Sequence, residues 1–239
     1  MPIGVIVNSA AVLLGGLLGA VLGTRIPERL RQALPLTFGA ASMAMGVNYI
    51  VQMKFLPAVV LSLIIGAGAG ELIKFEKGIE WAAGKMRGPV ERLFGGEASS
   101  ENQAEFMAQF VGILVLFCAS GTGIFGALNS GMTGDHTVLL AKSILDFFTA
   151  AIFATSLGYL VATICIPQFV ILLGLFLSAS LILPLATTAM IADFTALGGM
   201  IMLATGLRIS GIKSFPIANM LPSLLIVMPI SHLWATFIA

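Results

Sequence analysis

The hydrophobic residues of this chain fall into long runs separated by short charged stretches. Of its 23 charged residues, twelve lie between Glu71 and Glu105 and four between Arg25 and Arg31. A helix that crosses the hydrocarbon core of a bilayer needs about 20 mostly apolar residues. The stretches between charges and turn signals therefore predict about eight membrane-spanning helices, near residues 4–23, 34–52, 55–73, 106–128, 138–157, 159–183, 188–207 and 215–237.

Composition supports this interpretation. The 239 residues are 58% hydrophobic and only 10% charged, whereas a soluble domain carries about 25% charged residues. This excludes a soluble enzyme and a disordered chain, and the net charge of +1 gives no reason to expect a nucleic-acid partner. The two cysteines, Cys118 and Cys165, lie in apolar runs and form neither a disulfide framework nor a metal-ligand pattern. We expect one all-α polytopic membrane domain over residues 1–239, in contact with lipid and without cofactor or metal.

Lysine and arginine predict the orientation, because they concentrate in cytoplasmic loops. The loops after the first, third, fifth and seventh spans carry ten of them, and the opposite side carries only Lys54 and Lys142. Both termini are therefore expected outside the cytoplasm. The first apolar stretch lacks a basic leader region and is interpreted as a retained span.

The one long polar segment, residues 74–105, is predicted to be a cytoplasmic amphipathic connector. Apolar residues recur in it every three or four positions, and charged residues fill the other faces. Trp81 suits the headgroup boundary. The segment is interpreted as a connector on the membrane surface; a docking site for a regulator or partner is the alternative.

A pattern of glycine, lysine and proline occurs twice along the chain. Each copy has two glycines seven residues apart, followed by Lys-x-x-Pro and a long apolar span. If the copies descend from a duplication, the first three spans correspond to the last three, and their offset of five spans makes them cross the membrane in opposite senses. Inverted repeats are typical of secondary transporters. The copies are Gly39, Gly46, Lys54 and Pro57, and Gly199, Gly206, Lys213 and Pro216.

Glycines also recur every four residues in the first span, at Gly15, Gly19 and Gly23. Small residues at this spacing allow helix backbones to approach closely. The pattern predicts packing within the chain, or a homo-oligomer face.

The uncharged, glycine-rich stretch 119–136 is the first candidate site. Backbone at membrane depth needs partners of its own unless it borders protein or water. The stretch is therefore a candidate broken or re-entrant helix whose free backbone groups hold an ion or small polar group. Alternatively, the fourth span ends near Leu128 and residues 129–136 form a surface turn. The candidate residues are Ser120, Gly121, Thr122, Gly123, Asn129 and Asp135.

Lys142 and Asp146 in the fifth span are the second candidate site. Residues four apart share one face of a helix and can pair. Charge at the bilayer centre is costly, so the two are expected to pair or to face a polar cavity. They either bind a proton, cation or anion, or simply hold the fifth span to its neighbours. Asp193 near the start of the seventh span is a weaker candidate, and Asn8 is expected to form an interhelical hydrogen bond.

Several motifs resemble one family. They are the opening Met1-Pro2-Ile3-Gly4-Val5-Ile6-Val7-Asn8, the glycines Gly15-Gly16-x-x-Gly19, the run Ile124-Phe125-Gly126-Ala127-Leu128 with Gly134-Asp135, and Lys142-Ser143-x-x-Asp146. Together they resemble the YqgA-like bacterial inner-membrane proteins, the domain-of-unknown-function 554 family. The resemblance covers nearly the whole chain and implies a bacterial cytoplasmic membrane. It implies no substrate and no catalytic residues.

These patterns favour a small secondary transporter of an ion or polar metabolite, with the fourth and fifth spans lining its path. A structural or partner-binding membrane protein, such as a scaffold or accessory subunit, is the alternative, and a passive channel is a third. We do not expect an enzyme, because no acid–base pair or metal cluster is visible.

Overall fold

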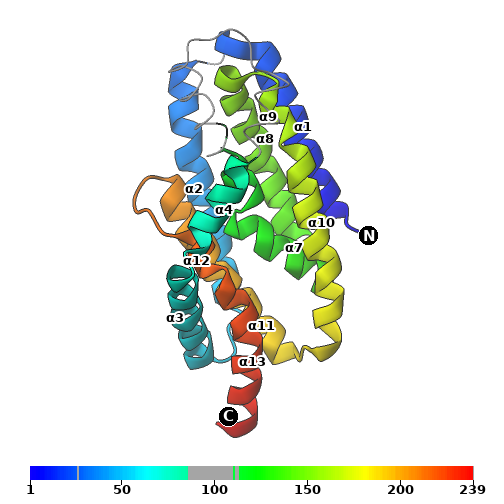
Figure 1. Ribbon diagram of the computed structural model, residues 1–239, viewed down its shortest axis with the longest axis vertical. Helices are drawn as coiled ribbons and strands as arrows, with labels where there is room; N and C mark the ends of the chain where they lie inside the picture. Colours follow the sequence, from blue (N-terminus) through cyan, green and yellow to red (C-terminus); the bar gives the residue numbers. More distant parts are fainter. Residues whose placement is uncertain (26, 86–109, 111–112, 239) are drawn as a thin grey trace.

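The computed structural model describes residues 1–25, 27–85, 110 and 113–238, and all its regular elements are helical (Figure 1). Residues 113–118 form a further helical segment ahead of α7. Very short helical turns follow α1 and α10. The helices are α1 (Ile3–Leu22), α2 (Glu28–Ile50), α3 (Leu56–Leu72), α4 (Phe75–Gly84), α7 (Gly121–Thr133), α8 (Thr137–Leu157), α9 (Leu160–Thr163), α10 (Cys165–Ile182), α11 (Thr188–Ile209), α12 (Ile217–Met220) and α13 (Pro222–Phe237).

Within the described residues, six helices are long and apolar enough to cross a membrane. A seventh span results if α3 and α4, which meet at a bend of 54°, count as one. The protein is therefore an all-α polytopic membrane protein with six or seven candidate spans. The expected second span, residues 34–52, falls in α2, which is not among the six; its first turn carries Glu28, Arg29 and Arg31.

Glycine and proline set the helix boundaries. The split between the fifth and sixth spans falls at Gly158, as predicted: α8 ends at Leu157, and Gly158 takes a φ of +61°. Only glycine adopts such a backbone angle without steric cost. Pro57 lies in the first turn of α3, where its missing N–H is harmless.

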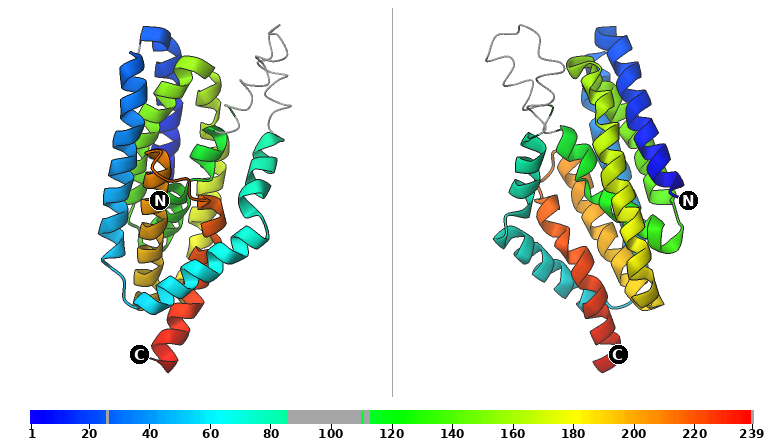
Figure 2. Two further views of the ribbon diagram at one scale, coloured as in Figure 1. Left: turned by 90° about the vertical axis from the view of Figure 1, so that its left-hand side faces the viewer. Right: turned by 45° about the vertical axis from the view of Figure 1, so that its right-hand side comes forward.

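The helices pack in close pairs (Figures 1 and 2). Helix α1 runs parallel to α8, whereas α2 on α11 and α3 on α13 are antiparallel. Glycines line these contacts. A Cβ added to Gly46 would lie 2.6 Å from the carbonyl oxygen of Gly199, and one added to Gly199 would lie 2.6 Å from that of Gly46. The α2–α11 interface is therefore backbone against backbone, as is usual where small residues replace side-chain interdigitation in membranes.

The α1 glycines are used inside the chain. Gly15 and Gly19 are buried against the backbone of Phe147 and Ala151 on α8. A homo-oligomer face through Gly15 and Gly19 is therefore a wrong prediction, because α8 already occupies that surface. A Cβ added to Gly23 would meet nothing within 4 Å, and Gly23 takes a φ of +50° where α1 ends.

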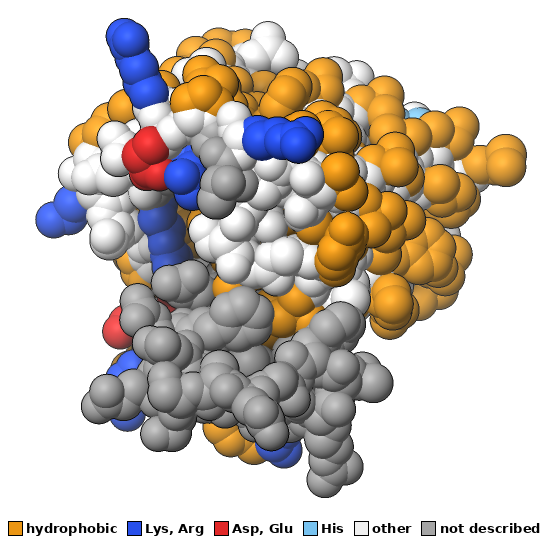
Figure 3. Space-filling view, turned by 90° about the horizontal axis from the view of Figure 1, so that it is seen from above, with side chains coloured by type: hydrophobic (Ala, Val, Ile, Leu, Met, Phe, Trp, Pro, Cys, Tyr) orange, Lys and Arg blue, Asp and Glu red, His pale blue; other side chains and the backbone are white. Residues whose placement is uncertain are grey.

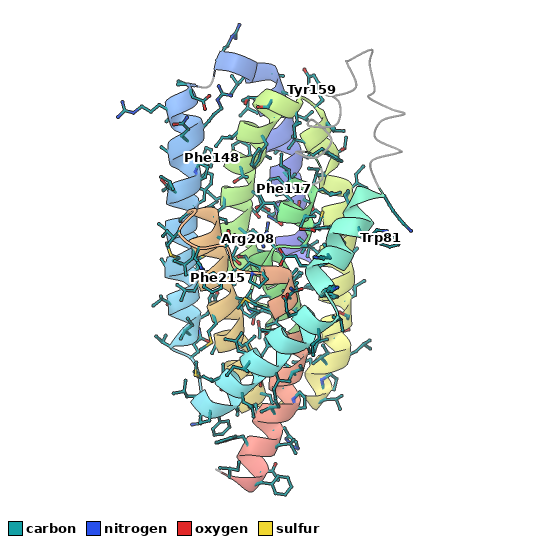
Figure 4. The ribbon with its side chains drawn as sticks, turned by 60° about the vertical axis from the view of Figure 1, so that its left-hand side comes forward. Trp81, Phe117, Phe148, Tyr159, Arg208 and Phe215 are labelled. Atoms are coloured by element: carbon teal, nitrogen blue, oxygen red, sulfur yellow. The ribbon has the colours of Figure 1, made fainter. Side chains whose placement is uncertain are left out.

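The polar connector begins as predicted with a helix, α4. Figure 4 shows Trp81 on its outer side, directed away from the bundle, and the residue is exposed. The rest of the predicted connector, from residue 86 to 105, lies outside the described residues. At the end of the molecule where α1 meets α2, Lys and Arg side chains gather on one part of the surface and hydrophobic side chains on another (Figure 3).

Candidate functional site

Lys142 and Asp146 form an ion pair one turn apart on α8, as their spacing predicts. Both are buried: Lys142 is 3% exposed and Asp146 7%. Taking two charges out of water costs several kcal/mol per ion, about as much as their mutual attraction returns. Such a pair therefore needs further hydrogen bonds.

Two amide side chains from other helices supply these bonds. Asn8 on α1 donates from Nδ2 to Asp146 Oδ2 at 2.8 Å, and Gln168 on α10 donates from Nε2 to the same oxygen at 3.0 Å. Gln168 Nε2 also donates to Asn8 Oδ1 at 2.9 Å. Asp146 Oδ2 thus accepts from three donors, which compensate its charge, whereas Oδ1 accepts from no donor among the described residues.

The helix break that borders this pair lies at residues 119–120, inside the candidate span Ile113–Thr133. Ser120 leaves the helical conformation and caps α7, with its Oγ accepting from the N–H of Gly123 at 3.1 Å. Serine is a favoured helix cap. A Cβ on Gly123 would lie 3.0 Å from Cε of Lys142, so this glycine leaves room for the lysine side chain.

The ion pair and the break share one cavity of about 550 Å³. Its polar lining includes Ser120 and Thr122 from the α7 start and Lys142, Asp146 and Thr149 from α8. Most of the remaining wall is hydrophobic, and Phe117, labelled in Figure 4, places its ring centroid 5.8 Å from Lys142 Nζ. The size and the mixed wall are typical of a site for a small molecule.

A second ion pair borders the same cavity. Arg208 of α11 donates from Nη1 to Glu76 Oε1 of α4 at 2.8 Å, and to the carbonyl of Phe215 at 3.1 Å (Figure 4). Asn219 of α12 accepts from the N–H of Glu76 at 2.7 Å and donates to Glu71 Oε2 at 2.5 Å. These bonds join α4 to the segment between α11 and α13.

The remaining candidates lie away from the cavity. Asn129 is buried within α7, and Asp135 is exposed in the turn before α8, where its Oδ1 accepts from the N–H of Thr137 at 2.9 Å. The buried Asp193 accepts from the N–H groups of Lys54 and Phe55 at 2.8 and 2.9 Å and from Ser231 at 2.6 Å. These bonds tie α11 to the start of α3 and to α13.

The helix is broken within residues 119–136, as in the first alternative, but the break lies at the start of this stretch and not along the glycine run. The glycine run is mostly helical, since α7 extends to Thr133, and Gly134 ends it with a φ of +75°. The break comes earlier, at residues 119–120, and the surface turn is only residues 134–136. Gly121 lies at the break, where a Cβ would collide with Ile201.

Sequence reasoning missed Gln168 altogether and gave Asn8 an interhelical hydrogen bond without naming its partner; the structure shows that Asn8 bonds to Asp146 and Gln168. A signal was available: Gln168 is a lone amide inside an apolar run, 160 residues after Asn8, the same separation as between Gly39 and Gly199. The structure makes the two amides neighbours. Among the described residues, no group of three or more His, Cys, Asp or Glu is arranged to hold a metal ion.

A family model covers residues 3–232 of this chain. The chain belongs to the DUF554 family. The family description reads "Protein of unknown function (DUF554)". The chain is 52% identical over its whole length to the full length of "Uncharacterized protein YqgA" of Escherichia coli. It is 30% identical to "Uncharacterized membrane protein YdfK" of Bacillus subtilis, with 93% of each of the two chains covered. No solved structure matches this DUF554 chain.

Proposed function

We propose that this protein is a secondary transporter of a small ion or polar metabolite in the bacterial inner membrane. One observation carries the proposal. A buried Lys142–Asp146 pair, held by amides from two further helices, borders a cavity at a helix break. Intramembrane charge and broken helices at one place are typical of substrate and ion pathways.

We further infer an inverted repeat, which is consistent with a transporter. Asn8 and Gln168 are separated by 160 residues, as are Gly39 and Gly199. A shift of this size superposes α1 on α10, α2 on α11 and α3 on α12 with α13. The members of each pair run in opposite directions (Figure 1).

The contacts between helices also agree with an exchange of the two halves by a shift of 160 residues. If a two-fold axis exchanges the halves, a contact between Gly39 and Gly206 requires one between Gly199 and Gly46, and both occur. Asn8 and Gln168, which the axis would exchange, bond to each other and to one carboxylate oxygen. Between the halves, α8 packs on α1 and α7 packs on α10.

This arrangement suggests how the site serves both sides of the membrane. Two similar halves that rock against each other expose a central cavity to each side in turn. In the conformation described, the ion pair between Arg208 and Glu76 links α4 to α11 beside the cavity, whose lining includes both residues. Since Asp146 is held by amides from both halves, their relative movement changes its hydrogen bonds and couples the site to the motion.

The proposal includes eight spans, with α2 and the bent α3–α4 pair added to the six other helices. Support for α2 is its close antiparallel contact with the candidate span α11. Eight spans leave both termini on the same side, which the distribution of lysine and arginine assigns to the outside.

The test is two-sided access to the cavity. Thr149→Cys, in a background without Cys118 and Cys165, is treated with a membrane-impermeant maleimide in right-side-out and inverted vesicles. We expect labelling from both sides. The control is Ala127→Cys, at a buried position outside the cavity lining, which should resist labelling from either side. Labelling of Thr149→Cys from one side only, or from neither, would favour a structural membrane protein.

A further inference from the structure

The described residues that line the cavity carry more positive than negative charge. They include three cations, Arg31, Lys142 and Arg208, and two carboxylates, Glu76 and Asp146. Each carboxylate is paired with a cation of the same lining, and the third cation, Arg31, bonds to Glu28, which is not part of the lining. Arg31 Nε is buried and has no partner among the described residues.

The environment of Lys142 suits an anion. Its ammonium group has three N–H donors, and its one hydrogen bond to a described residue goes to Asp146. The first turn of α7, with Ser120 and Thr122, borders the same space, and the N-terminus of a helix favours negative charge. Two carboxylate oxygens of the lining, Asp146 Oδ1 and Glu76 Oε2, also have no hydrogen-bond donor among the described residues, so the site is suited to one negative charge and not to several.

The rest of the wall suits a hydrocarbon group. Apolar side chains from α2, α8 and the segment before α7 surround the polar end, among them Phe38, Phe117, Leu145, Ile152 and Phe153. Burial of apolar surface contributes about 25 cal/mol per Å². A ligand without an apolar part would forgo this gain.

Resting on the proposed transport function, we propose that the substrate is a small organic monocarboxylate with a short hydrocarbon body. Its carboxylate binds Lys142 beside the start of α7, and its hydrocarbon body lies against the aromatic and aliphatic wall. Small cations and zwitterions are disfavoured, because Asp146 already has three donors on Oδ2 and offers an ammonium group only Oδ1.

Four probes of nearly equal shape test the charge preference. They are 2-oxoisovalerate, which is an anion, valine, a zwitterion, valinol, a cation, and 3-methyl-2-butanone, which is neutral. Binding to the purified full chain is measured by isothermal titration. We expect 2-oxoisovalerate to bind at least tenfold more tightly than the other three. Stronger binding of valine or valinol would overturn the proposal, as would stronger binding of oleate, which would assign the cavity to lipid.

The matched variant is Lys142→Met/Asp146→Asn, which removes both charges and leaves no buried ion unpaired. It should lose 2-oxoisovalerate binding at least tenfold while keeping a cooperative thermal transition. If it fails to fold, Thr149→Val, which lines the cavity and leaves the ion pair intact, serves as the second variant. That change should weaken binding of 2-oxoisovalerate about as much as binding of the neutral ketone, so the charge preference should persist.

Uptake into proteoliposomes separates this inference from the proposed function. Uptake of 2-oxoisovalerate, abolished in the double variant, supports both. Binding without uptake supports the site and contradicts transport. Uptake of valine in place of the oxo acid supports transport and contradicts the monocarboxylate assignment.

Discussion

At the scale of single residues, Asp146 of the Lys142–Asp146 ion pair accepts three hydrogen bonds, all on Oδ2. Asn8 and Gln168 come from two other helices and reach the same oxygen. Burial of an ion pair is weak evidence for stability, because desolvation offsets attraction. Stability alone therefore does not explain why the pair is buried, whereas a role in the proposed binding site does.

Removing one charge of the pair should be more damaging than removing both. Lys142→Met alone leaves Asp146 as a buried, uncompensated charge, which costs about 3–5 kcal/mol. The double variant Lys142→Met/Asp146→Asn should unfold close to the wild-type temperature. Thermal unfolding in detergent measures both. If the double variant is as unstable as the single one, the pair acts mainly as a structural clamp.

Asp193 should behave as a structural carboxylate. Asp193→Asn weakens the bonds to Lys54, Phe55 and Ser231, and we expect a loss of about 1.5–3 kcal/mol, the range for bonds to charged groups. Binding of cavity ligands by the folded fraction should stay unchanged. Asp135→Asn is the matched control, because Oδ1 of an asparagine can accept the same bond from the N–H of Thr137.

The sequence allowed part of this site to be predicted. A spacing of four residues was enough to pair Lys142 with Asp146, because helix geometry is local. Asn8 and Gln168 could not be assigned to the pair, since a bond between residues 160 apart depends on how helices pack. Asp193 and Asp135 look alike in sequence as isolated carboxylates, and only tertiary contacts distinguish the buried one from the exposed one.

At the scale of helices, the glycine contacts of α2 and α11 leave no room for side chains. A Cβ at Gly199 meets the carbonyl oxygen of Gly46, which is rigid backbone. Gly199→Ala should therefore cost about 1–3 kcal/mol, the usual penalty for overpacking. Thermal unfolding in detergent is again the measurement.

Gly174 on α10 is the control for this experiment. A Cβ there meets nothing within 4 Å, so Gly174→Ala should be neutral or should stabilise the helix by about 0.5–1 kcal/mol. Equal effects of Gly199→Ala and Gly174→Ala would contradict the close contact of α2 and α11.

Helix boundaries were predictable where the chemistry is local. Gly158 separates α8 from α9 because the backbone there needs a positive φ. The glycine run after Gly121 was a harder case: glycine weakens a helix in water, but inside this bundle it lets α7 pack on α10, where Gly131 meets the backbone of Phe176. The break falls at Ser120 because serine caps the following helix.

At the scale of the whole molecule, the eight spans proposed above determine where the termini lie. An even number of spans places both termini on one side, and the distribution of lysine and arginine assigns that side to the outside. Alkaline phosphatase fused after residue 239 should be active, and green fluorescent protein fused there should be dark. A phosphatase fusion after Lys85, in the predicted cytoplasmic connector, should be inactive. Inactive phosphatase and bright green fluorescent protein at the C-terminus would place it in the cytoplasm and indicate seven spans.

If the cavity opens to the two sides of the membrane in turn, locking one side should close that side alone. Glu76→Cys and Arg208→Cys, added to Thr149→Cys, replace the ion pair between α4 and α11, and a short bis-maleimide then joins these two positions. Impermeant labelling of Thr149→Cys is measured from each side before and after cross-linking. We expect cross-linking to abolish labelling from one side and to preserve it from the other. Labelling that persists from both sides would indicate a passive channel, and its loss from both would contradict alternating access.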